Sequence, residues 1–309
     1  MTAIRIEECQ SKPFLKWVGG KTQILDKVLS LFPEEVNNYF EPFLGGGSVL
    51  IELLSRVKRG DVKLAGNVFA YDLNSDLITV YKHVQNYPRR LLEEIIKLKT
   101  EYESCGNEKP NRSPQTKEEA IRSEESYYYY IRECFNKEEK GTIKSSAMFI
   151  FLNKTCFRGV YRIGPNGFNV PFGHYKNPAI IDASNILELS ELFQNVQFSQ
   201  SSFEDCPFWK DSNEKDFVYL DPPYAPETIT SFVAYNKDGF SLEDHQTLFN
   251  LCNNTNVDFL LSNSAVPLVL TSFPIDRYTI ETISCKRSIN PKDPSKRTDE
   301  VLIKPKRNS

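Results

Sequence analysis

The sequence predicts an α/β fold in which a mainly parallel sheet carries helices on both faces. Three observations lead to this prediction. Strand-like apolar segments alternate with helix-like segments in residues 1–84, the alternation resumes in residues 181–309, and residues 85–144 between them show no strand pattern. Alternating strands and helices form parallel sheets covered on both faces. We therefore expect one domain interrupted by a helical and β-hairpin insertion over residues 85–180.

In the first part of the chain, an opening turn and helix precede two strand–turn–helix segments. "FLKWVGGK" predicts a turn, and the apolar spacing of "TQILDKVLSLF" predicts a helix that ends before Pro33. "NNYFEPFLGGGSVLIELL" then predicts a strand, a glycine-rich turn and a helix that begins at Ser48. "GNVFAYDLNSDLITVYKHV" predicts a strand that reaches Tyr71, then an acid, then a helix.

The insertion and the last part of the chain differ in pattern. "EYESCGNEKPNRSPQTKEEAIRSEE" predicts a polar loop, "SYYYYIRECF" a half-buried helix, and "SSAMFIFLNKTCF" a helix or a strand. "GPNG" between "VYRI" and "FNVPF" predicts a hairpin. After residue 180, strands are predicted at "NVQFSQ", "DFVYLD", "VDFLLSN" and "DRYTIETI", followed by the polar loop "SINPKDPSKRT" and a last strand, "EVLIK".

The composition is that of an ordinary globular protein, with 40% hydrophobic and 26% charged residues among 309. No apolar run approaches the roughly 20 residues that span a bilayer, and the first residues lack the apolar core of a signal peptide. Seven cysteines without a C-x-x-C pair and three scattered histidines predict reduced thiols and no metal site. We expect an intracellular, cytoplasmic or nucleoid-associated protein without a membrane partner.

The charge is unevenly distributed along the chain. Residues 141–181 contain no Asp or Glu but five Lys or Arg, whereas the whole chain has a formal net charge of −3. We call this segment the basic island. Such a cluster on an acidic protein is typical of a surface that binds a polyanion, and the alternative is a solvated charged face.

A cofactor site is predicted at the ends of the first two strands. The glycine turn "EPFLGGG" (41–47) lets the backbone approach a ligand, and Asp72 at the end of the next strand can accept both hydroxyls of a ribose. The G-x-G-x-x-G spacing of diphosphate cofactors is absent, because Leu50 stands where the last glycine would fall. An adenosine cofactor without phosphates fits better, and the alternative is that the glycines only form turns.

A second ligand site is predicted at "FVYLDPPYAP" (217–226). A strand fits as far as Leu220, and the two prolines end it because neither can donate a backbone N–H. Asp221 and Tyr224 are therefore expected at a rigid strand end, where open α/β sheets bind ligands. An acid, a free carbonyl and an aromatic ring suit a flat substrate. The alternative is that Asp221 caps a turn and Tyr224 packs in the core.

Together these motifs resemble one family. "PFLKWVGGK", "YFEPFLGGG", "YDLN", "FLNKTCFRGVYR", "GFNVPFGHYKNP", "LDPPY", "LLSNS" and "KRSIN…RTDEVLI" look like the Dam-type (D12 class, alpha group) site-specific DNA adenine-N6 methyltransferases. Their order also matches, and the resemblance extends from about Pro13 to Ile303. It implies a Rossmann-like S-adenosylmethionine-dependent methyltransferase fold, with the catalytic domain in residues 1–84 and 181–309 and target recognition in residues 85–180.

For the reaction, the resemblance implies methyl transfer to the N6 amine of adenine in duplex DNA, with Asp221, Pro222, Pro223 and Tyr224 as catalytic residues. The Asp221 carboxylate and the Pro222 carbonyl can accept the N6 hydrogens, and both interactions strengthen as N6 becomes positive. Tyr224 offers a ring on which a flipped adenine can stack, because a paired base cannot present N6 to a pocket. Direct transfer of this kind needs no strong base.

For the cofactor, the resemblance implies S-adenosylmethionine. Lys21 reaches toward the carboxylate of the methionine part, Asp72 binds the ribose, and Phe203 packs on the adenine, although Phe203 also fits an ordinary core position. The residues that the resemblance assigns to the cofactor are Trp17, Lys21, Phe43, Gly45, Gly46, Asp72, Ser202, Phe203 and Asp221.

For DNA, the resemblance places sequence recognition in the basic island. Arg162 stands where an arginine reads a guanine, and Phe157 where an aromatic ring wedges into the duplex. The other positions implied as DNA contacts are Lys154, Arg158, Tyr175 and Lys176, with Arg287, Lys296 and Arg297 in the C-terminal loop.

The recognition sequence follows less directly from the resemblance. GATC, a short palindrome, is the family's site. Arg158 stands where asparagine is expected and His174 where arginine is expected. These two departures leave the predicted chemistry unchanged, but they weaken the transfer of GATC to this chain.

Other functions remain open from the sequence. RNA adenine or a protein glutamine amide would keep the chemistry and change the substrate, and the basic hairpin-bearing insertion favours duplex DNA over both. An inactive DNA-binding protein is disfavoured by the intact Asp221–Tyr224 motif, which binding alone does not need. An active enzyme would stand alone or accompany a restriction endonuclease that recognises the same site without direct contact.

Overall fold

The computed structural model describes residues 11–226, 239–286 and 297–306, excluding the side chains of residues 284–298. The chain forms two compact units. The helical unit consists of Met1–Gln23, Gly45–Lys58 and Asn74–Asn195, and the sheet unit consists of Ile24–Leu44, Arg59–Leu73 and Val196–Ser309. These two units are defined by how the chain packs. The predicted division at residues 85 and 180 separates catalysis from target recognition, and it stays a prediction.

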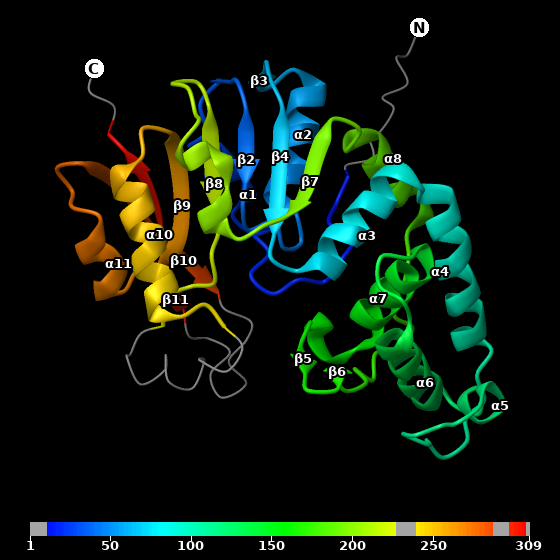
Figure 1. The fold of residues 1–309 in the computed structure, drawn as a ribbon. Helices are drawn as coiled ribbons and strands as arrows, with labels where there is room; N and C mark the ends of the chain where they lie inside the picture. The colour runs from blue at the N-terminus through cyan, green and yellow to red at the C-terminus, as the bar shows by residue number, and fades with distance from the viewer. Residues whose placement is uncertain (1–10, 227–238, 287–296, 307–309) are drawn as a thin grey trace, which may run out of the picture. The chain divides into compact units, whose positions relative to one another are not determined.

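The sheet unit contains a seven-stranded sheet. Its strands are β2 (Tyr39–Glu41), β4 (Val68–Asp72), β7 (Val196–Gln200), β8 (Phe217–Leu220), β9 (Asp258–Ser264), β10 (Tyr278–Lys286) and β11 (Arg297–Pro305). They lie in the order β10-β11-β9-β8-β2-β4-β7 (Figure 1). The pairs β2–β4, β2–β8, β4–β7 and β8–β9 are parallel, and β11 is antiparallel to both neighbours. The predicted mainly parallel α/β sheet is confirmed.

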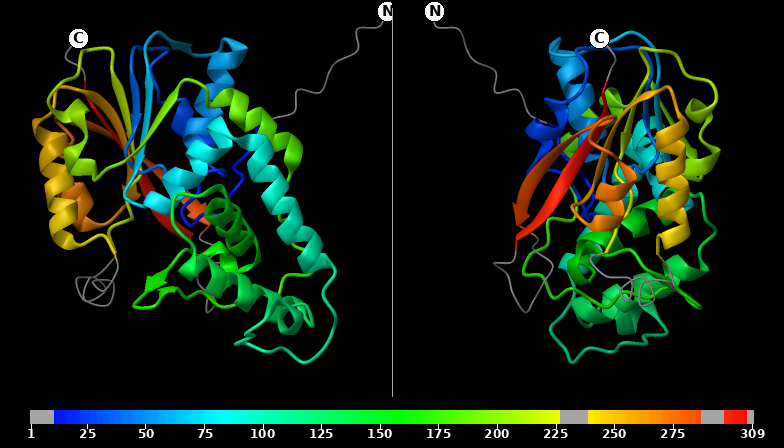
Figure 2. Two further views of the ribbon diagram at one scale, coloured as in Figure 1. Left: turned by 45° about the vertical axis from the view of Figure 1, so that its right-hand side comes forward. Right: turned by 90° about the vertical axis from the view of Figure 1, so that its left-hand side faces the viewer.

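Alternate residues of β8 show how the two faces of this sheet are covered. Val218 and Leu220 belong to the core that the sheet shares with α10 (Leu242–Asn254) and α11 (Pro267–Ser272), which lie along one face (Figure 2). Phe217 and Tyr219 lie on the other face against Phe32, with ring centroids 4.6 Å and 6.0 Å from it. Phe32 follows the short helix α1 (Leu25–Leu29). The helix predicted over residues 22–32 is therefore much shorter than expected.

A second small sheet, which the sequence pattern did not predict, joins two short segments of the sheet unit. β1 (Glu35–Val36) pairs in parallel with β3 (Lys63–Leu64). It carries none of the predicted site residues.

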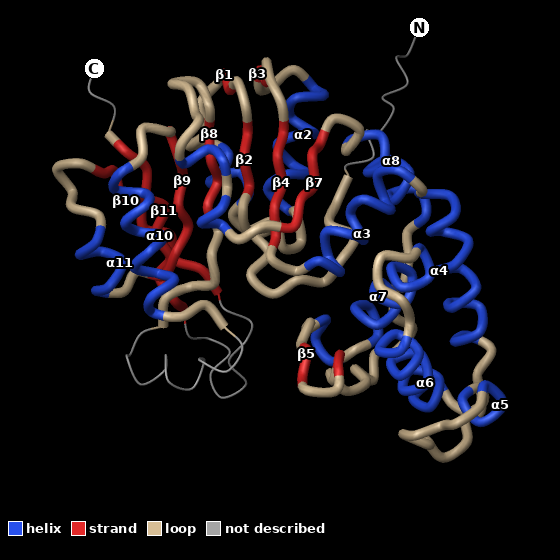
Figure 3. Tube along the Cα trace, in the orientation of Figure 1, coloured by secondary structure: helices blue, strands red, loops and turns tan. Residues whose placement is uncertain are grey.

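The helical unit contains most of the helices in the described residues (Figure 3). They are α2 (Ser48–Arg59), α3 (Ser75–Asn86), α4 (Pro88–Glu103), α5 (Lys117–Ala120), α6 (Glu124–Lys137), α7 (Ile143–Thr155) and α8 (Ala183–Leu192). Helix α2 begins at Ser48 as predicted. The polar segment predicted as a loop contains α5, which Thr116 caps by accepting from the Glu119 N–H.

Helix α7 resolves the segment whose periodicity fitted either a helix or a strand. It packs against α3, α4 and α6, and residues 145–153 are all buried. A helix surrounded by other helices has no polar face, so its sequence shows no helical period.

The predicted hairpin is confirmed in the helical unit. β5 (Ile163–Gly164) pairs in antiparallel register with β6 (Gly167–Phe168). Gly167 has φ +93°, and a Cβ there would meet the Asn136 side chain at 2.5 Å. Only glycine fits this turn without displacing its neighbour.

Candidate active site

In the sheet unit, the carboxyl ends of parallel strands carry several predicted site residues. β4 ends at Asp72, and Asp221 directly follows β8. From β2 the chain continues to β4 and β7 on one side, whereas β8 and β9 lie on the other, so the direction of winding reverses between β2 and β8. Ligands bind at such a reversal in open α/β sheets, beyond the carboxyl ends of the strands.

Strand β9 and its neighbour β11 hold the Asp221–Tyr224 segment in place. The Tyr224 hydroxyl lies 2.6 Å from Ser262 Oγ and donates to Glu300 Oε2 at 3.0 Å. The Ala225 N–H donates to Asn263 Oδ1 at 2.9 Å, and the Ser264 hydroxyl donates to the Ala225 carbonyl. The hydroxyl of Tyr224 is thus held by residues of two strands, and this fixes where the far end of the ring lies.

Tyrosines around the segment stay protonated. Burial, with the nearby carboxylate of Asp221, raises the pKa of both Tyr224 and Tyr219 well above the usual value. Burial and the adjacent Glu41 carboxylate do the same to Tyr39, whose hydroxyl donates to Glu41 Oε2 at 2.7 Å. Tyr224 is therefore a neutral hydrogen-bond donor, and it offers no base at neutral pH.

A cluster of aromatic rings lies near the predicted cofactor residues of the sheet unit. Phe43 stacks on Phe203 with centroids 5.5 Å apart, and Phe240 contacts both rings at 5.8 Å and 5.4 Å. Phe203 is buried in the core, whereas Phe43 is half-buried. Ser202 caps the short 3-10 turn that begins at Phe203. Phe43 is thus the more accessible of the two predicted rings.

The glycine turn of the helical unit is shaped around Trp17. Gly45 has φ +49°, and a Cβ on it would lie 2.9 Å from Trp17 Cδ1. A Cβ on Gly46 would lie 2.9 Å from Trp17 Cβ. The Tyr81 hydroxyl donates to the Gly45 carbonyl at 3.1 Å. These glycines therefore make room for the Trp17 side chain.

Lys21 stabilises the loop that carries Trp17 through two hydrogen bonds. Its backbone N–H donates to Ser48 Oγ at 3.2 Å, and its ammonium donates to the Gly19 carbonyl at 2.7 Å. The side chain is buried. Lys21 thus joins the Trp17 loop to the first residue of α2.

The basic island presents three of its predicted DNA contacts to solvent. Phe157 is 48% exposed, and the Arg158 guanidinium lies 5.3 Å from its ring. Arg162 is exposed on the hairpin, where its Nε donates to Asn169 Oδ1 at 2.6 Å. These side chains lie on one short segment and on the hairpin that follows it.

The predicted phosphate contacts of the basic island differ in how exposed they are. Lys176 is exposed, whereas Lys154 is half-buried, and burial with repulsion from Lys16 and Lys12 lowers the pKa of Lys154 to about 8. The ring of Tyr175 lies under the Lys16 ammonium, 3.6 Å from its centroid. Arg287 and Lys296 lie outside the described residues, as does the side chain of Arg297 at the start of β11.

Comparison with known proteins decides the family. Residues 17–289 match the family described as D12 class N6 adenine-specific DNA methyltransferase. The chain belongs to this family.

Relatives of this methyltransferase match over nearly their whole length. The Type II methyltransferase M.MjaIII of Methanocaldococcus jannaschii is 38% identical over 307 residues, covering 94% of this chain and 98% of the relative. The Type II methyltransferase M1.LlaDCHI of Lactococcus lactis is 30% identical, covering 98% of both chains. The DNA adenine methylase of Escherichia coli K12 is 30% identical, covering 95% of both. The protein is an adenine-specific DNA methyltransferase.

Sequence reasoning missed one residue that organises the methyltransferase's helical unit. Asn153, buried on α7, accepts from the Lys16 N–H at 2.8 Å and donates to the Lys16 carbonyl at 2.7 Å. Its amide also donates to the Gly159 carbonyl at 3.1 Å. Asn153 therefore ties the loop before Trp17 to the turn that carries Phe157. Its position within "FLNKTCF" was the available signal.

The two departures from the family pattern share a backbone conformation. Arg158 has φ +56° and His174 has φ +53°. Asparagine tolerates this left-handed region better than arginine does, so the backbone at position 158 suits the asparagine that was expected there. In the described part of the chain, every helix is too short or too polar to cross a bilayer.

Proposed function

We propose that this enzyme transfers a methyl group from S-adenosylmethionine to the N6 amine of an adenine that it flips out of duplex DNA. The observation that carries the proposal is the Asp221–Tyr224 segment at the carboxyl end of β8, with Tyr224 fixed through Ser262 and Glu300. An acid and a free carbonyl at a rigid strand end are suited to a flat base with an exocyclic amine.

The chemistry assigned to Asp221 and Pro222 is electrostatic. Adenine N6 is a poor nucleophile because its lone pair is delocalised into the ring. The Asp221 carboxylate and the Pro222 carbonyl accept its two hydrogens, and both interactions strengthen as positive charge develops on N6. Pro223 keeps the segment rigid, and the neutral Tyr224 supplies a ring on which the flipped base stacks.

The residues present fit S-adenosylmethionine, which supplies an electrophilic methyl group on sulfur when bound. We assign Asp72, at the end of β4, to the ribose hydroxyls and Phe203 to the adenine, with the half-buried Phe43 stacked on Phe203. We assign Trp17, Lys21, Gly45 and Gly46 of the helical unit to the same cofactor. Phe43, Ser202, Phe203 and Asp221 complete the assignment in the sheet unit.

Recognition of DNA is assigned to the basic island. The exposed Arg162 reads a guanine through its guanidinium, and the exposed Phe157 enters the base stack beside the flipped adenine. Lys154, Tyr175 and Lys176 are assigned to the DNA backbone, and Arg287 and Arg297 to further phosphates. Arg158 is assigned to DNA as well, where it bears on the recognised site or its flanks. Residues 85–180 are the proposed target-recognition region, and GATC is the proposed site.

The experiment is the mapping of modified adenines after incubation of the purified enzyme with S-adenosylmethionine and genomic DNA that lacks methylation. We expect N6-methyladenine at one short palindrome. Parallel reactions with RNA of the same sequence and with a glutamine-containing peptide are expected to stay unmodified. Modification of RNA or peptide in preference to DNA, or adenines modified without a common sequence, would contradict the proposal.

The relatives named as Type II methyltransferases support a second part of the proposal. We propose that a restriction endonuclease which cuts the same sequence accompanies this enzyme, without direct contact between them. DNA modified by the enzyme is then expected to resist that endonuclease in a cleavage assay. Cleavage of fully modified DNA at the mapped site would contradict this pairing.

A further inference from the structure

Tyr161 lies in the helical unit immediately before Arg162, and its ring belongs to an aromatic stack. Its centroid is 6.2 Å from that of Trp17 with the two planes 24° apart, and 5.2 Å from that of Phe149. On the hairpin side it contacts Phe168 at 5.7 Å. The ring therefore connects the loop that carries Trp17 with the last residue of β6.

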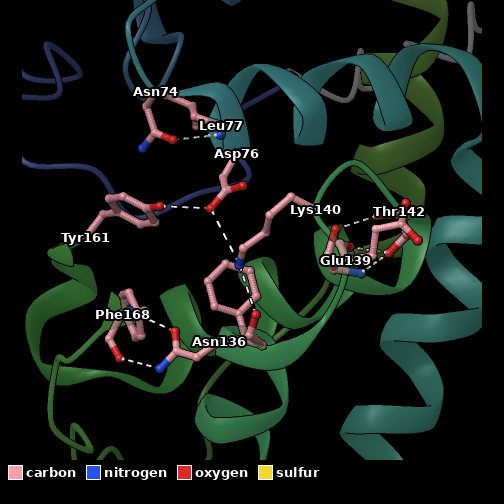
Figure 4. A network of polar contacts seen from close by, with 11 residues as sticks. Asn74, Asp76, Leu77, Asn136, Glu139, Lys140, Thr142, Tyr161 and Phe168 are labelled. Atoms are coloured by element: carbon pink, nitrogen blue, oxygen red, sulfur yellow. Dashed lines mark hydrogen bonds and ion pairs between the residues drawn. The ribbon is translucent and has the colours of Figure 1, made fainter. Parts of the chain in front are cut away.

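The hydroxyl of Tyr161 connects the hairpin to a helix as well (Figure 4). It donates to Asp76 Oδ2 at 2.9 Å, in the first turn of α3. The Lys140 ammonium lies 3.8 Å from the same oxygen and 3.3 Å from the centroid of the Phe135 ring. Burial and the Asp76 carboxylate raise the pKa of Tyr161 above its usual value, so the hydroxyl keeps its proton.

The position of Arg162 depends on this hairpin. The Arg162 Nε donates to Asn169 Oδ1 at 2.6 Å, and the Asn169 N–H donates to the Arg162 carbonyl at 3.2 Å. Asn136 on α6 fixes the far strand, because it accepts from the Phe168 N–H at 2.8 Å and donates to the Phe168 carbonyl at 3.1 Å (Figure 4). Asn136 and Tyr161 thus anchor the two strands of the hairpin separately.

We propose that Tyr161 is a positioning residue for target recognition: its hydroxyl bond to Asp76 holds the hairpin so that Arg162 meets the edge of one base. The inference rests on the role proposed above for Arg162. A guanidinium that reads a base through two hydrogen bonds tolerates little displacement, whereas a contact to a phosphate tolerates more. Loss of the anchor therefore lowers discrimination between sites more than it lowers affinity for DNA in general.

The test compares two tyrosines that make the same kind of bond. Tyr161→Phe removes the hydroxyl and keeps the ring in its stack. Tyr102→Phe is the matched control, because the Tyr102 hydroxyl also donates to a carboxylate, Glu124 Oε2, at 2.9 Å. The measurement is the ratio of kcat/KM for the mapped site to kcat/KM for a site changed by one base pair. We expect about a five- to tenfold lower ratio for Tyr161→Phe and an unchanged ratio for Tyr102→Phe.

Arg162→Ala and the double variant show whether Tyr161 acts through Arg162. We expect Arg162→Ala to lower discrimination, and Tyr161→Phe to change it less than twofold further in that background. If Arg162→Ala lowers discrimination but Tyr161→Phe does not, the inference is wrong and the role of Arg162 stands. Equal losses from Tyr161→Phe in both backgrounds also overturn the inference. If Arg162→Ala keeps full discrimination, both the proposed role of Arg162 and the inference fail.

Discussion

At the scale of single residues, Lys154 illustrates how burial changes a DNA contact. Its pKa is lowered to about 8 because the half-buried ammonium is desolvated and lies near Lys16 and Lys12. A phosphate beside it would favour the charged form, so DNA binding takes up a proton when the pH is above about 8. This linkage makes the affinity for DNA fall as the pH rises through that value.

Lys154→Arg tests this linkage, because arginine keeps its charge throughout the range. Between pH 7 and pH 9.5, we expect the parent to lose up to about tenfold more affinity than the variant, measured by fluorescence anisotropy with labelled duplex. Parallel pH profiles for the two proteins would contradict a contact between Lys154 and DNA.

Arg158 illustrates a second effect, a backbone conformation that suits another residue. Its φ of +56° is strained for arginine. We expect Arg158→Asn to raise the free energy of unfolding by about 0.5 kcal/mol in urea denaturation, because asparagine tolerates this region. Arg158→Lys is the matched control and should give no gain. Equal stability of the Asn and Lys variants would show that the conformation is not strained.

At the scale of elements, the glycine turn before α2 depends on space for Trp17. A methyl group on Gly45 would lie 2.9 Å from the indole ring, whereas a Cβ on Gly141, which also has a positive φ, meets nothing within 4 Å. We expect Gly45→Ala to weaken S-adenosylmethionine binding about tenfold or more by displacing Trp17. Gly141→Ala should leave it unchanged in calorimetry. Unchanged cofactor affinity in Gly45→Ala would contradict the role assigned to Trp17.

The link from β9 and β11 to Tyr224 predicts a change in kcat. Tyr224→Phe keeps the ring and removes its bonds to Ser262 and Glu300. We expect kcat to fall about tenfold with little change in KM for DNA, because the ring is held less firmly. Tyr278→Phe is the matched control. Its hydroxyl donates to Asn253 Oδ1 at 3.0 Å and makes no bond to Ser262 or Glu300. Equal effects of the two variants would show that the Tyr224 bonds only stabilise the fold.

The local sequence predicted most strands of the sheet. It did not predict the type of one buried helix or the length of another. The strand that ends at Leu220 follows from the two prolines after it, and the helix that begins at Ser48 follows from the glycine turn before it. Helix α7 could not be told from a strand, because burial on all sides removes its period. The helix around Leu25 is shorter than its apolar spacing indicated, and no side chain caps its first turn.

The motif residues of the candidate site were predictable from the sequence, whereas the contacts that hold them were not. Motif residues such as Asp72 and Asp221 lie at strand ends, as their spacing indicated. The contacts of Asn153 with Lys16, and of Asn263 with Ala225, join residues far apart in the chain. No spacing rule in a single sequence reveals such pairs, and their roles appear only in the folded structure.

At the scale of the whole molecule, the charge distribution reconciles an acidic protein with a DNA substrate. The formal net charge is −3, while residues 141–181 carry five basic and no acidic side chains. A local positive field attracts phosphate even when the whole chain is negative, because salt screens charges beyond about 10 Å. The negative remainder disfavours binding of DNA elsewhere on the surface.

The reaction proposed for the whole enzyme depends on Asp221 polarising the adenine amine, and the rate of a single methyl transfer reports on that step. Asp221→Ala and the parent are compared in single-turnover methylation of a duplex that contains the mapped site, with DNA binding measured in parallel. We expect the variant to bind the duplex like the parent but to methylate it at least about 100-fold more slowly. A variant that binds DNA and methylates adenine at the parent's rate would contradict it.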